Sequence, residues 1–220
     1  MTPQALTCAH CGAPLTFRAP FCAYCRTIIN WDRDLLITRG APFFELDFSH
    51  DKLPGWEDAP RSHDGAKLAI EKDDWEYYGS FTPKVRNACI VVRGVALDRH
   101  GYIGVKARVS GEGDAHSGYK LRAYPHLRSW RLVREVGYKQ NNEIQDMVAW
   151  EYSAAVAPVN ELNEVELRLA DSVLQVSING QHITTVYDAG FLFGGLSWLV
   201  GSIDSHATVM LKSAAAYRAI

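Results

Sequence analysis

The sequence predicts a mainly β protein in which a small cysteine-rich unit precedes an antiparallel two-sheet sandwich. Three observations support this prediction. Four cysteines crowd into the first 25 residues, apolar and polar residues alternate through most of the remaining chain, and an Asn-Gly pair separates two of the alternating segments. The chain has 220 residues, of which 47% are hydrophobic and 22% charged, so it can bury a core and is not expected to be disordered.

The cysteine-rich unit predicts a metal site. The residues concerned form two Cys-x-x-Cys pairs, namely Cys8, Cys11, Cys22 and Cys25. Two thiolates on one tight turn can face a single cation, and two such turns provide the four sulfurs of a closed structural Zn²⁺ site. Gly12, which directly follows the first pair, suits the positive φ that such a turn requires.

Other interpretations of these cysteines are weaker, but one stays open. The start of the chain lacks the pattern of a secretory signal, so we expect a cytoplasmic protein with reduced thiols rather than disulfides. A rubredoxin-type iron site would use the same four thiolates, and the sequence does not separate iron from zinc. The fifth cysteine, Cys89, lies in an apolar run and is expected to be a small buried hydrophobic residue.

Residues 8–29 resemble the short zinc ribbons of bacterial proteins. The resemblance rests on Cys-x-x-Cys-Gly-Ala-Pro-Leu, beginning at Cys8, and on Cys-x-Tyr-Cys-Arg-Thr, beginning at Cys22. It implies a structural metal and no particular function. We therefore expect a zinc ribbon over residues 1–30 and a linker over residues 31–41.

The remaining residues, 42–220, are predicted to form the sandwich. Apolar residues occupy every second position in 103–109, 119–123, 165–169 and 174–178, as strands with one buried face require. Further apolar runs bring the expected number of strands to about eleven or twelve. Asn179-Gly180 predicts a two-residue hairpin turn and thus a three-stranded meander over 163–187. Residues 143–152 fit a helix and a strand about equally well.

The same region resembles the concanavalin A-like lectin and glucanase superfamily, especially its laminin-G-like and family-16-glycosidase-like modules. The features that carry this resemblance are Phe44-x-x-x-Phe48, Gly55-Trp56, Gly65-x-x-Leu68, Gly118-Tyr119-x-Leu121, Trp130-x-Leu132-x-Arg134, Asn163-x-Val165-x-Leu167, Val176-x-Ile178-Asn179-Gly180 and Phe193-Gly194-Gly195-Leu196. The resemblance implies a jelly roll whose concave sheet often carries the ligand site.

The sequence favours a protein without catalytic activity. Retaining glycosidases of that superfamily carry Glu-x-Asp-x-x-Glu on one strand. The nearest segment here begins at Glu143 and has Gln145 in place of the Asp and Val148 in place of the second Glu. The carboxylate pair that hydrolysis needs is therefore missing.

A ligand face is expected on the strands that combine aromatic and basic residues. Alternation with inward Tyr119, Leu121 and Leu132 indicates outward side chains, and the candidates are Lys120, Arg122, Tyr124, Arg131 and Arg134. Such a face would be basic and would favour an anionic partner. The competing interpretation is that these residues form only the solvated side of a structural sheet.

The resulting functional hypothesis is a cytoplasmic recognition or scaffold protein, stabilised by zinc, whose lectin-like sandwich binds a protein or a glycan. The alternatives are a carbohydrate-active enzyme with a non-standard site and nucleic-acid binding through the zinc ribbon. The net charge of −2 argues against a general nucleic-acid binder. No apolar stretch is long enough to predict a membrane span.

Overall fold

The computed structural model describes residues 10–13, 21–27, 37–53, 59–71, 76–111, 117–138 and 141–220. Within them lie fourteen strands and one 3₁₀ turn, η1 (Pro125–Leu127). The strands are β1 (Arg39–Asp47), β2 (Arg61–Ser62), β3 (Gly65–Ile70), β4 (Glu76–Val85), β5 (Ala88–Ala96), β6 (Gly101–Ser110), β7 (Ser117–Tyr124), β8 (Ser129–Tyr138), β9 (Asn141–Tyr152), β10 (Leu162–Ala170), β11 (Val173–Ile178), β12 (Gln181–Tyr187), β13 (Gly194–Ser202) and β14 (Ala207–Ala219). The prediction of a mainly β fold is confirmed.

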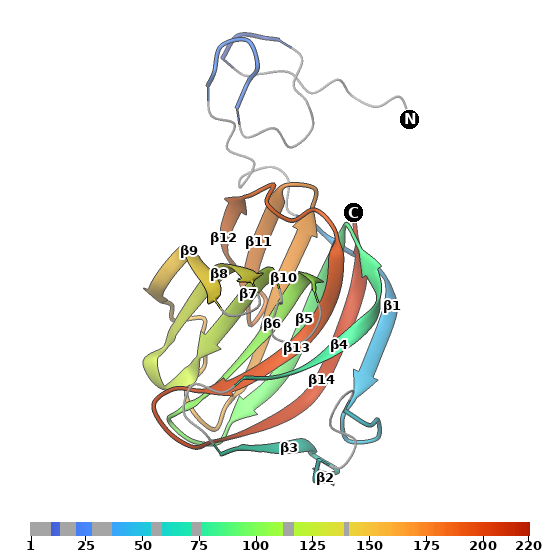
Figure 1. Cartoon of the computed structure of the whole chain (residues 1–220), viewed down its shortest axis with the longest axis vertical. Helices are drawn as coiled ribbons and strands as arrows, with labels where there is room; N and C mark the ends of the chain where they lie inside the picture. The colour runs from blue at the N-terminus through green and yellow to red at the C-terminus, as the bar shows by residue number, and fades with distance from the viewer. Residues whose placement is uncertain are drawn as a thin grey trace.

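The described strands form two antiparallel sheets that pack face to face (Figure 1). The eight-stranded sheet has the order β12-β11-β10-β5-β14-β3-β2, with β1 paired to β14 beside β3. The six-stranded sheet has the order β4-β13-β6-β7-β8-β9. Their inner faces enclose one main core of alternating apolar side chains, in which Trp130 and Trp198 are the largest members.

The predicted meander is present as β10, β11 and β12. Asn179 and Gly180 form the turn between the last two of these strands, with φ of 51° and 77°. Positive φ at both positions is the requirement of a type I′ hairpin. The period-2 pattern and the turn residues therefore indicate the same local structure.

Three strands were not assigned from the sequence, namely the two-residue β2 and the two edge strands of the six-stranded sheet. Residues 143–152, which fit a helix and a strand equally well, lie in β9 at the edge of the six-stranded sheet. At the opposite edge lies β4, which no prediction covered although its sequence is rich in aromatic residues. Both edge strands contribute side chains to the candidate site described below.

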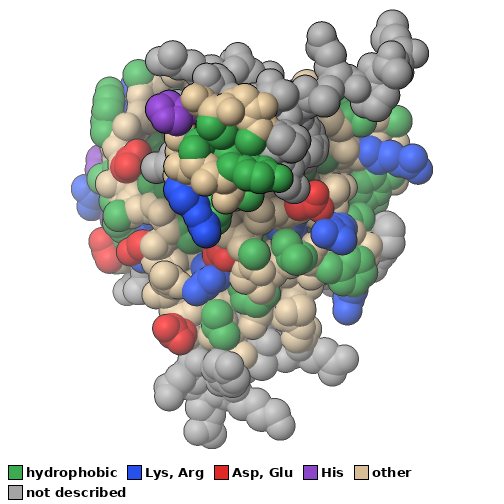
Figure 2. Space-filling view, turned by 90° about the horizontal axis from the view of Figure 1, so that it is seen from above, with side chains coloured by type: hydrophobic (Ala, Val, Ile, Leu, Met, Phe, Trp, Pro, Cys, Tyr) green, Lys and Arg blue, Asp and Glu red, His purple; other side chains and the backbone are tan. Residues whose placement is uncertain are grey.

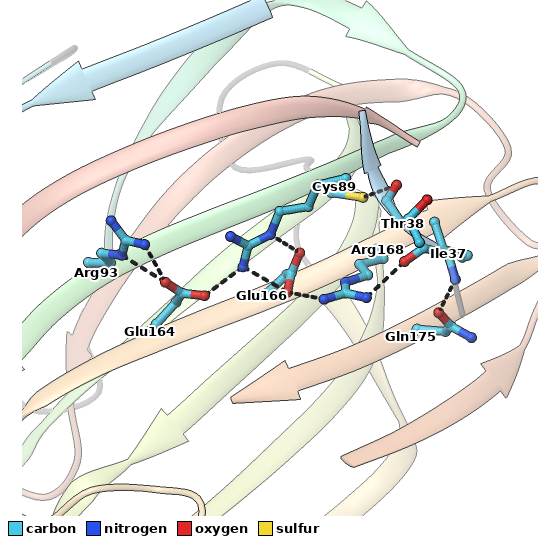
Figure 3. Close-up of polar contacts among 9 residues, drawn as sticks. Ile37, Thr38, Cys89, Arg93, Glu164, Glu166, Arg168 and Gln175 are labelled. Atoms are coloured by element: carbon cyan, nitrogen blue, oxygen red, sulfur yellow. Dashed lines mark hydrogen bonds and ion pairs between the residues drawn. The ribbon is translucent and has the colours of Figure 1, made fainter. Parts of the chain in front are cut away.

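A short segment before β1 covers part of the outer face of the eight-stranded sheet (Figure 3). Ile37 packs on Cys89 and Val173, and its backbone N–H donates to Gln175 Oε1 at 2.7 Å. Arg168 donates to the carbonyl oxygen of Ile37 at 2.8 Å. The described part of the stretch expected to be a linker is thus attached to the sandwich, and Cys89 is buried as predicted.

An ion-pair chain continues from this anchor along the same face (Figure 3). Arg39 Nε donates to Glu166 at 2.7 Å, and its terminal nitrogen donates to Glu164 at 2.5 Å. Arg93 binds Glu164, and Arg168 binds Glu166. The side chain of Glu166 is 1% exposed, so this pairing offsets the desolvation of a buried carboxylate.

In the part of the chain that the structure describes, no helix has the length and apolar character needed to cross a bilayer.

Candidate functional site

Three of the four predicted metal ligands come together. The sulfur atoms of Cys11, Cys22 and Cys25 lie within 4.8 Å of one another, and the first two are 3.7 Å apart. Neighbouring thiolates around a tetrahedral Zn²⁺ are about 3.8 Å apart, as bonds of about 2.3 Å require. The fourth predicted ligand, Cys8, lies outside the described residues. Cys11, Cys22 and Cys25 thus form a cluster that could bind a metal.

The two cysteine turns share a backbone feature. Gly12 and Arg26, each of which follows the second cysteine of its pair, have φ of 69° and 61°. In the second turn, the N–H of Arg26 donates to the carbonyl oxygen of Cys22 at 2.9 Å. Hydrogen bonds from the side chain and backbone of Thr27 lower the pKa of the Cys25 thiol to about 6, which favours the thiolate form that metals bind.

A second candidate site lies on the outer face of the six-stranded sheet. Cross-strand register places Lys106 of β6 opposite Lys120 of β7, and Arg122 of β7 opposite Arg131 of β8. Like charges on directly opposed residues destabilise a sheet unless anions lie between them. These cations therefore need carboxylates from other strands.

Those carboxylates come from both sides of the face. Glu76 of the edge strand β4 forms ion pairs with Lys120, at 2.6 Å, and with Arg122. Glu135 of β8 pairs with Lys120 at 2.9 Å and lies 3.7 Å from the Nζ of Lys106. We call these five residues the charge cluster. It contains three cations and two carboxylates, and each side chain is at most 14% exposed.

Burial and pairing shift the titration of the charge cluster. Desolvation raises the pKa of Glu76, but the charges of Arg122 and Lys120 outweigh it and lower the pKa to about 2. Desolvation, followed by the charge of Lys120, lowers the pKa of Lys106 to about 8. Glu76 is thus fully ionised at neutral pH, whereas Lys106 is close to losing its proton.

A row of aromatic rings borders the charge cluster. Tyr102 and Tyr124 have ring centroids 5.1 Å apart, and Trp150 of β9 follows at 4.2 Å from Tyr124. The ring of Tyr102 lies over the backbone of Gly201, where an added Cβ would come within 2.1 Å of the tyrosine oxygen. Its hydroxyl donates to Glu76 at 2.9 Å.

Only one end of the aromatic row is open to solvent. Tyr102 and Tyr124 are each 3% exposed, whereas Trp150 is 45% exposed and the neighbouring Tyr152 is 73% exposed. Arg131 lies with its guanidinium 5.9 Å from the Trp150 ring and donates to Asp146 at 2.6 Å. We call Trp150, Tyr152, Arg131 and Asp146 the β9 platform.

The structure separates the five predicted ligand residues. Lys120, Arg122, Tyr124 and Arg131 share the outer face. Arg134 does not, because it lies opposite inward-facing Tyr119 and binds Asp188 at 3.0 Å at the margin of the core. Its predicted outward orientation is wrong, since residues three positions apart in a regular strand point to opposite faces.

The outer face is also less basic than predicted. Lys120 and Arg122 are paired with Glu76 and Glu135, and Arg131 is paired with Asp146. Figure 2 views a different part of the surface, the upper end of the molecule, where acidic and basic side chains are interspersed among the described residues. Glu76, which sequence reasoning missed, could have been found only through the alternation of β4.

The segment that resembles a glycosidase motif forms no carboxylate pair on one face. Glu143 is exposed on β9, Gln145 accepts a hydrogen bond from Arg134, and Asp146 accepts one from Arg131. The carboxylates of the charge cluster flank the ammonium of Lys120 instead. A general acid needs a raised pKa, whereas the pKa of Glu76 is lowered.

Comparison with solved structures supports the fold. A Bacillus subtilis protein of unknown function with a galectin-like fold is similar to this chain at a TM-score of 0.60 and 11% identity, covering 84% of this chain and 99% of its own. The carbohydrate-binding module CBM66 from B. subtilis is similar at a TM-score of 0.55 and 10% identity, covering 72% of this chain and 90% of its own. A Bacteroides ovatus GH16 protein of a mixed-linkage glucan locus is similar at a TM-score of 0.52 and 10% identity, covering 78% of this chain and 98% of its own.

These likenesses define the class of fold. The described part of this chain has a galectin-like β-sandwich fold. No protein-family model matches the sequence, and no curated protein matches it significantly. Identities of about a tenth show a shared fold, and what the fold binds must be argued from the site.

Proposed function

We propose that this protein is a non-enzymatic recognition protein whose sandwich binds a glycan at the β9 platform. The observation that carries the proposal is the exposed Trp150 ring beside the Arg131–Asp146 ion pair. The apolar C–H face of a sugar ring stacks on an aromatic face. Arginine and aspartate beside that ring can donate to and accept from the sugar hydroxyls.

The buried part of the site supports this proposal by holding the platform in place. The buried ring of Tyr124 contacts the ring of Trp150, and Tyr124 itself packs with Tyr102 and Leu199. Rigid aromatic residues lose little conformational entropy when a ligand binds. The charge cluster then has a structural role, and the platform provides the contact surface.

The absence of catalysis in this proposal follows from the charge cluster. Glu76 is ionised at neutral pH and cannot donate a proton to a glycosidic oxygen. Lys120 occupies the position between Glu76 and Glu135 that a substrate would need. Several solved neighbours are described as glycan-binding or glycan-cleaving proteins, and we extend only glycan binding to this chain.

We further propose that the cysteine cluster belongs to a structural zinc ribbon. The sulfur distances and the two matching turns support a tetrahedral thiolate site. A unit of this size has too few apolar residues for a core of its own, so the metal would provide most of its folding free energy. Thiols kept ready for metal fit a reducing compartment such as the cytoplasm.

A glycan array tests the binding proposal directly. The full-length protein and its Trp150→Ala and Phe193→Ala variants would be applied at equal concentration, with generic glycoside turnover measured in parallel. Phe193 is the matched control, because it is 58% exposed on the loop before β13 and lies outside the platform. We expect specific glycan signals that Trp150→Ala loses and Phe193→Ala keeps.

Three results would contradict the proposal. These are a complete lack of glycan binding, binding that persists in Trp150→Ala, and turnover of a glycoside. The first would favour a protein partner for the same surface.

A further inference from the structure

A pocket of about 240 Å³ lies at the end of the six-stranded sheet beside Tyr124. It is formed by the loop between β5 and β6, the loop between β13 and β14, and η1. Tyr124, Leu127 and Ile203 provide apolar walls, and the exposed side chains of Arg99 and Asp204 provide charge. None of these groups belongs to the β9 platform or to the charge cluster.

The pocket is preformed by hydrogen bonds that join two of its loops. The ring Nδ1 of His100 lies 2.9 Å from the carbonyl oxygen of Ile203, and its Nε2 accepts from Arg99 Nε at 2.9 Å. A carbonyl oxygen only accepts and a guanidinium only donates, so in this arrangement Nδ1 acts as the donor and Nε2 as the acceptor. The N–H of Ile203 in turn donates to the carbonyl oxygen of His100 at 3.0 Å.

A second anchor holds the β5–β6 loop. Asp98 accepts hydrogen bonds from the backbone N–H groups of His100, at 3.0 Å, and Gly101, at 3.1 Å. Its other carboxylate oxygen accepts from the N–H of Thr208 at the start of β14. A ligand therefore meets walls that are already in position, as is typical of small-molecule sites.

The charges of the pocket select the chemistry of the ligand. Within the described residues, neither Asp204 nor the terminal nitrogens of Arg99 have a hydrogen-bond or ion-pair partner, and the two groups form no ion pair with each other. An anionic ligand would face Asp204, and a cationic one would face Arg99. Hydroxyl groups satisfy both, because each donates one hydrogen bond and accepts others.

We infer that this pocket binds one pyranose unit through vicinal hydroxyls, with its C–H face against Leu127, which is 49% exposed. Arg99 donates to the hydroxyl oxygens, and Asp204 accepts from the hydroxyl hydrogens. Tyr124 also contacts Trp150, at 4.2 Å between ring centroids, so the pocket adjoins the β9 platform. The inference rests on the proposed function and adds a second subsite to it, which takes one sugar unit.

The test uses the full-length protein labelled with ¹⁵N. The imidazole resonances of His100 and His126, which both line the pocket, are followed during titration with three methyl glycosides, those of D-glucopyranose, D-galactopyranose and D-mannopyranose. Cyclohexanol serves as a ring of similar size without vicinal hydroxyls. The variants are Asp204→Asn and, as a control, Asp171→Asn, whose carboxylate pairs with Arg86 elsewhere on the surface.

We expect at least one glycoside to shift both imidazoles, cyclohexanol to leave them unchanged, and Asp204→Asn to weaken binding about tenfold. Asp204 has φ of 60°, a conformation that asparagine also tolerates, so the variant should fold. Asp171→Asn should bind as the wild type does.

The inference is overturned if none of the three glycosides shifts the imidazoles, if cyclohexanol shifts them equally, or if Asp204→Asn has no effect. The array separates this inference from the proposed function. Glycan binding that requires Trp150 but not Asp204 would reject the pocket and keep the proposed function. If the glycosides shift the imidazoles but the array signal does not depend on Trp150, the pocket is kept and binding at the β9 platform is rejected.

Discussion

Replacing Lys106 by methionine should make the protein more stable at neutral pH. The Lys106 side chain is 3% exposed and contributes the third cation to a charge cluster with only two carboxylates. Desolvation, with repulsion from Lys120, lowers its pKa from 10.5 to about 8. A shift of this size corresponds to at most about 3 kcal/mol for keeping the ammonium charged in the fold. The Nζ of Lys106 lies 4.5 Å from the centroid of the Tyr78 ring. Methionine removes the charge and replaces this cation–π contact with a contact between its thioether sulfur and the ring.

The sign of the pH dependence follows from the lowered pKa. Between about pH 8 and pH 10.5 the unfolded chain holds the Lys106 proton and the folded chain does not, so the stability of the wild type rises through this window. The advantage of Lys106→Met is therefore largest below about pH 8 and should vanish near pH 10.5. Urea denaturation of both proteins on either side of this window measures the difference.

A matched variant, Lys120→Met, tests whether the charge cluster simply tolerates the replacement of any lysine by methionine. Lys120→Met leaves Glu76 and Glu135 without their shared ammonium, and breaking a buried pair in this way costs about 3–5 kcal/mol. The two lysines lie directly opposite each other in the sheet, yet their replacement should have opposite effects. A Lys106→Met variant less stable than the wild type at neutral pH, or an advantage unchanged at pH 10.5, would refute the argument.

Two further predictions concern the metal and the aromatic row. Protein purified without added metal should contain about one zinc per chain by elemental analysis, and Cys22→Ser should lose the metal while the sandwich melts unchanged; a metal-free protein would contradict this. Gly201→Ala should lower stability by about 1–3 kcal/mol in thermal denaturation, because its Cβ would overlap the ring of Tyr102, whereas Gly195→Ala on the same strand has no contact closer than 3.7 Å and should be nearly neutral. Equal effects of the two glycine substitutions would reject the packing explanation.

Sequence alternation predicts which face of a strand a residue occupies, but not whether that face is exposed to solvent. Leu121 points inward and Lys120 and Arg122 outward, as their period-2 spacing requires. Their burial depends on Glu76, which lies 44 residues before Lys120 and on a strand at the sheet edge. Local pattern contains no information about such a pairing.

The same limit applies to the eight-stranded sheet. Gln175 and Ser177 occupy polar positions of an alternating strand and were expected to face solvent, yet each is 1% exposed. The backbone of Ile37, from a segment 138 residues away, covers this face and satisfies Gln175. The cysteine turns were easier to predict, because their chemistry is contained within a few consecutive residues.

The attachment of Ile37 to the sheet limits the distance between the cysteine cluster and the sandwich. The stretch between Thr27 and Ile37, residues 28–36, can span at most about 35 Å even when fully extended. A partner that contacts both the cysteine cluster and the sandwich would therefore meet the second surface at an effective concentration in the millimolar range. Two individually weak contacts could then combine into tight and selective capture. Substitutions that remove the hydrogen bonds holding Ile37 to the sheet would lengthen the connection and weaken that combined binding, even with both contact surfaces unchanged.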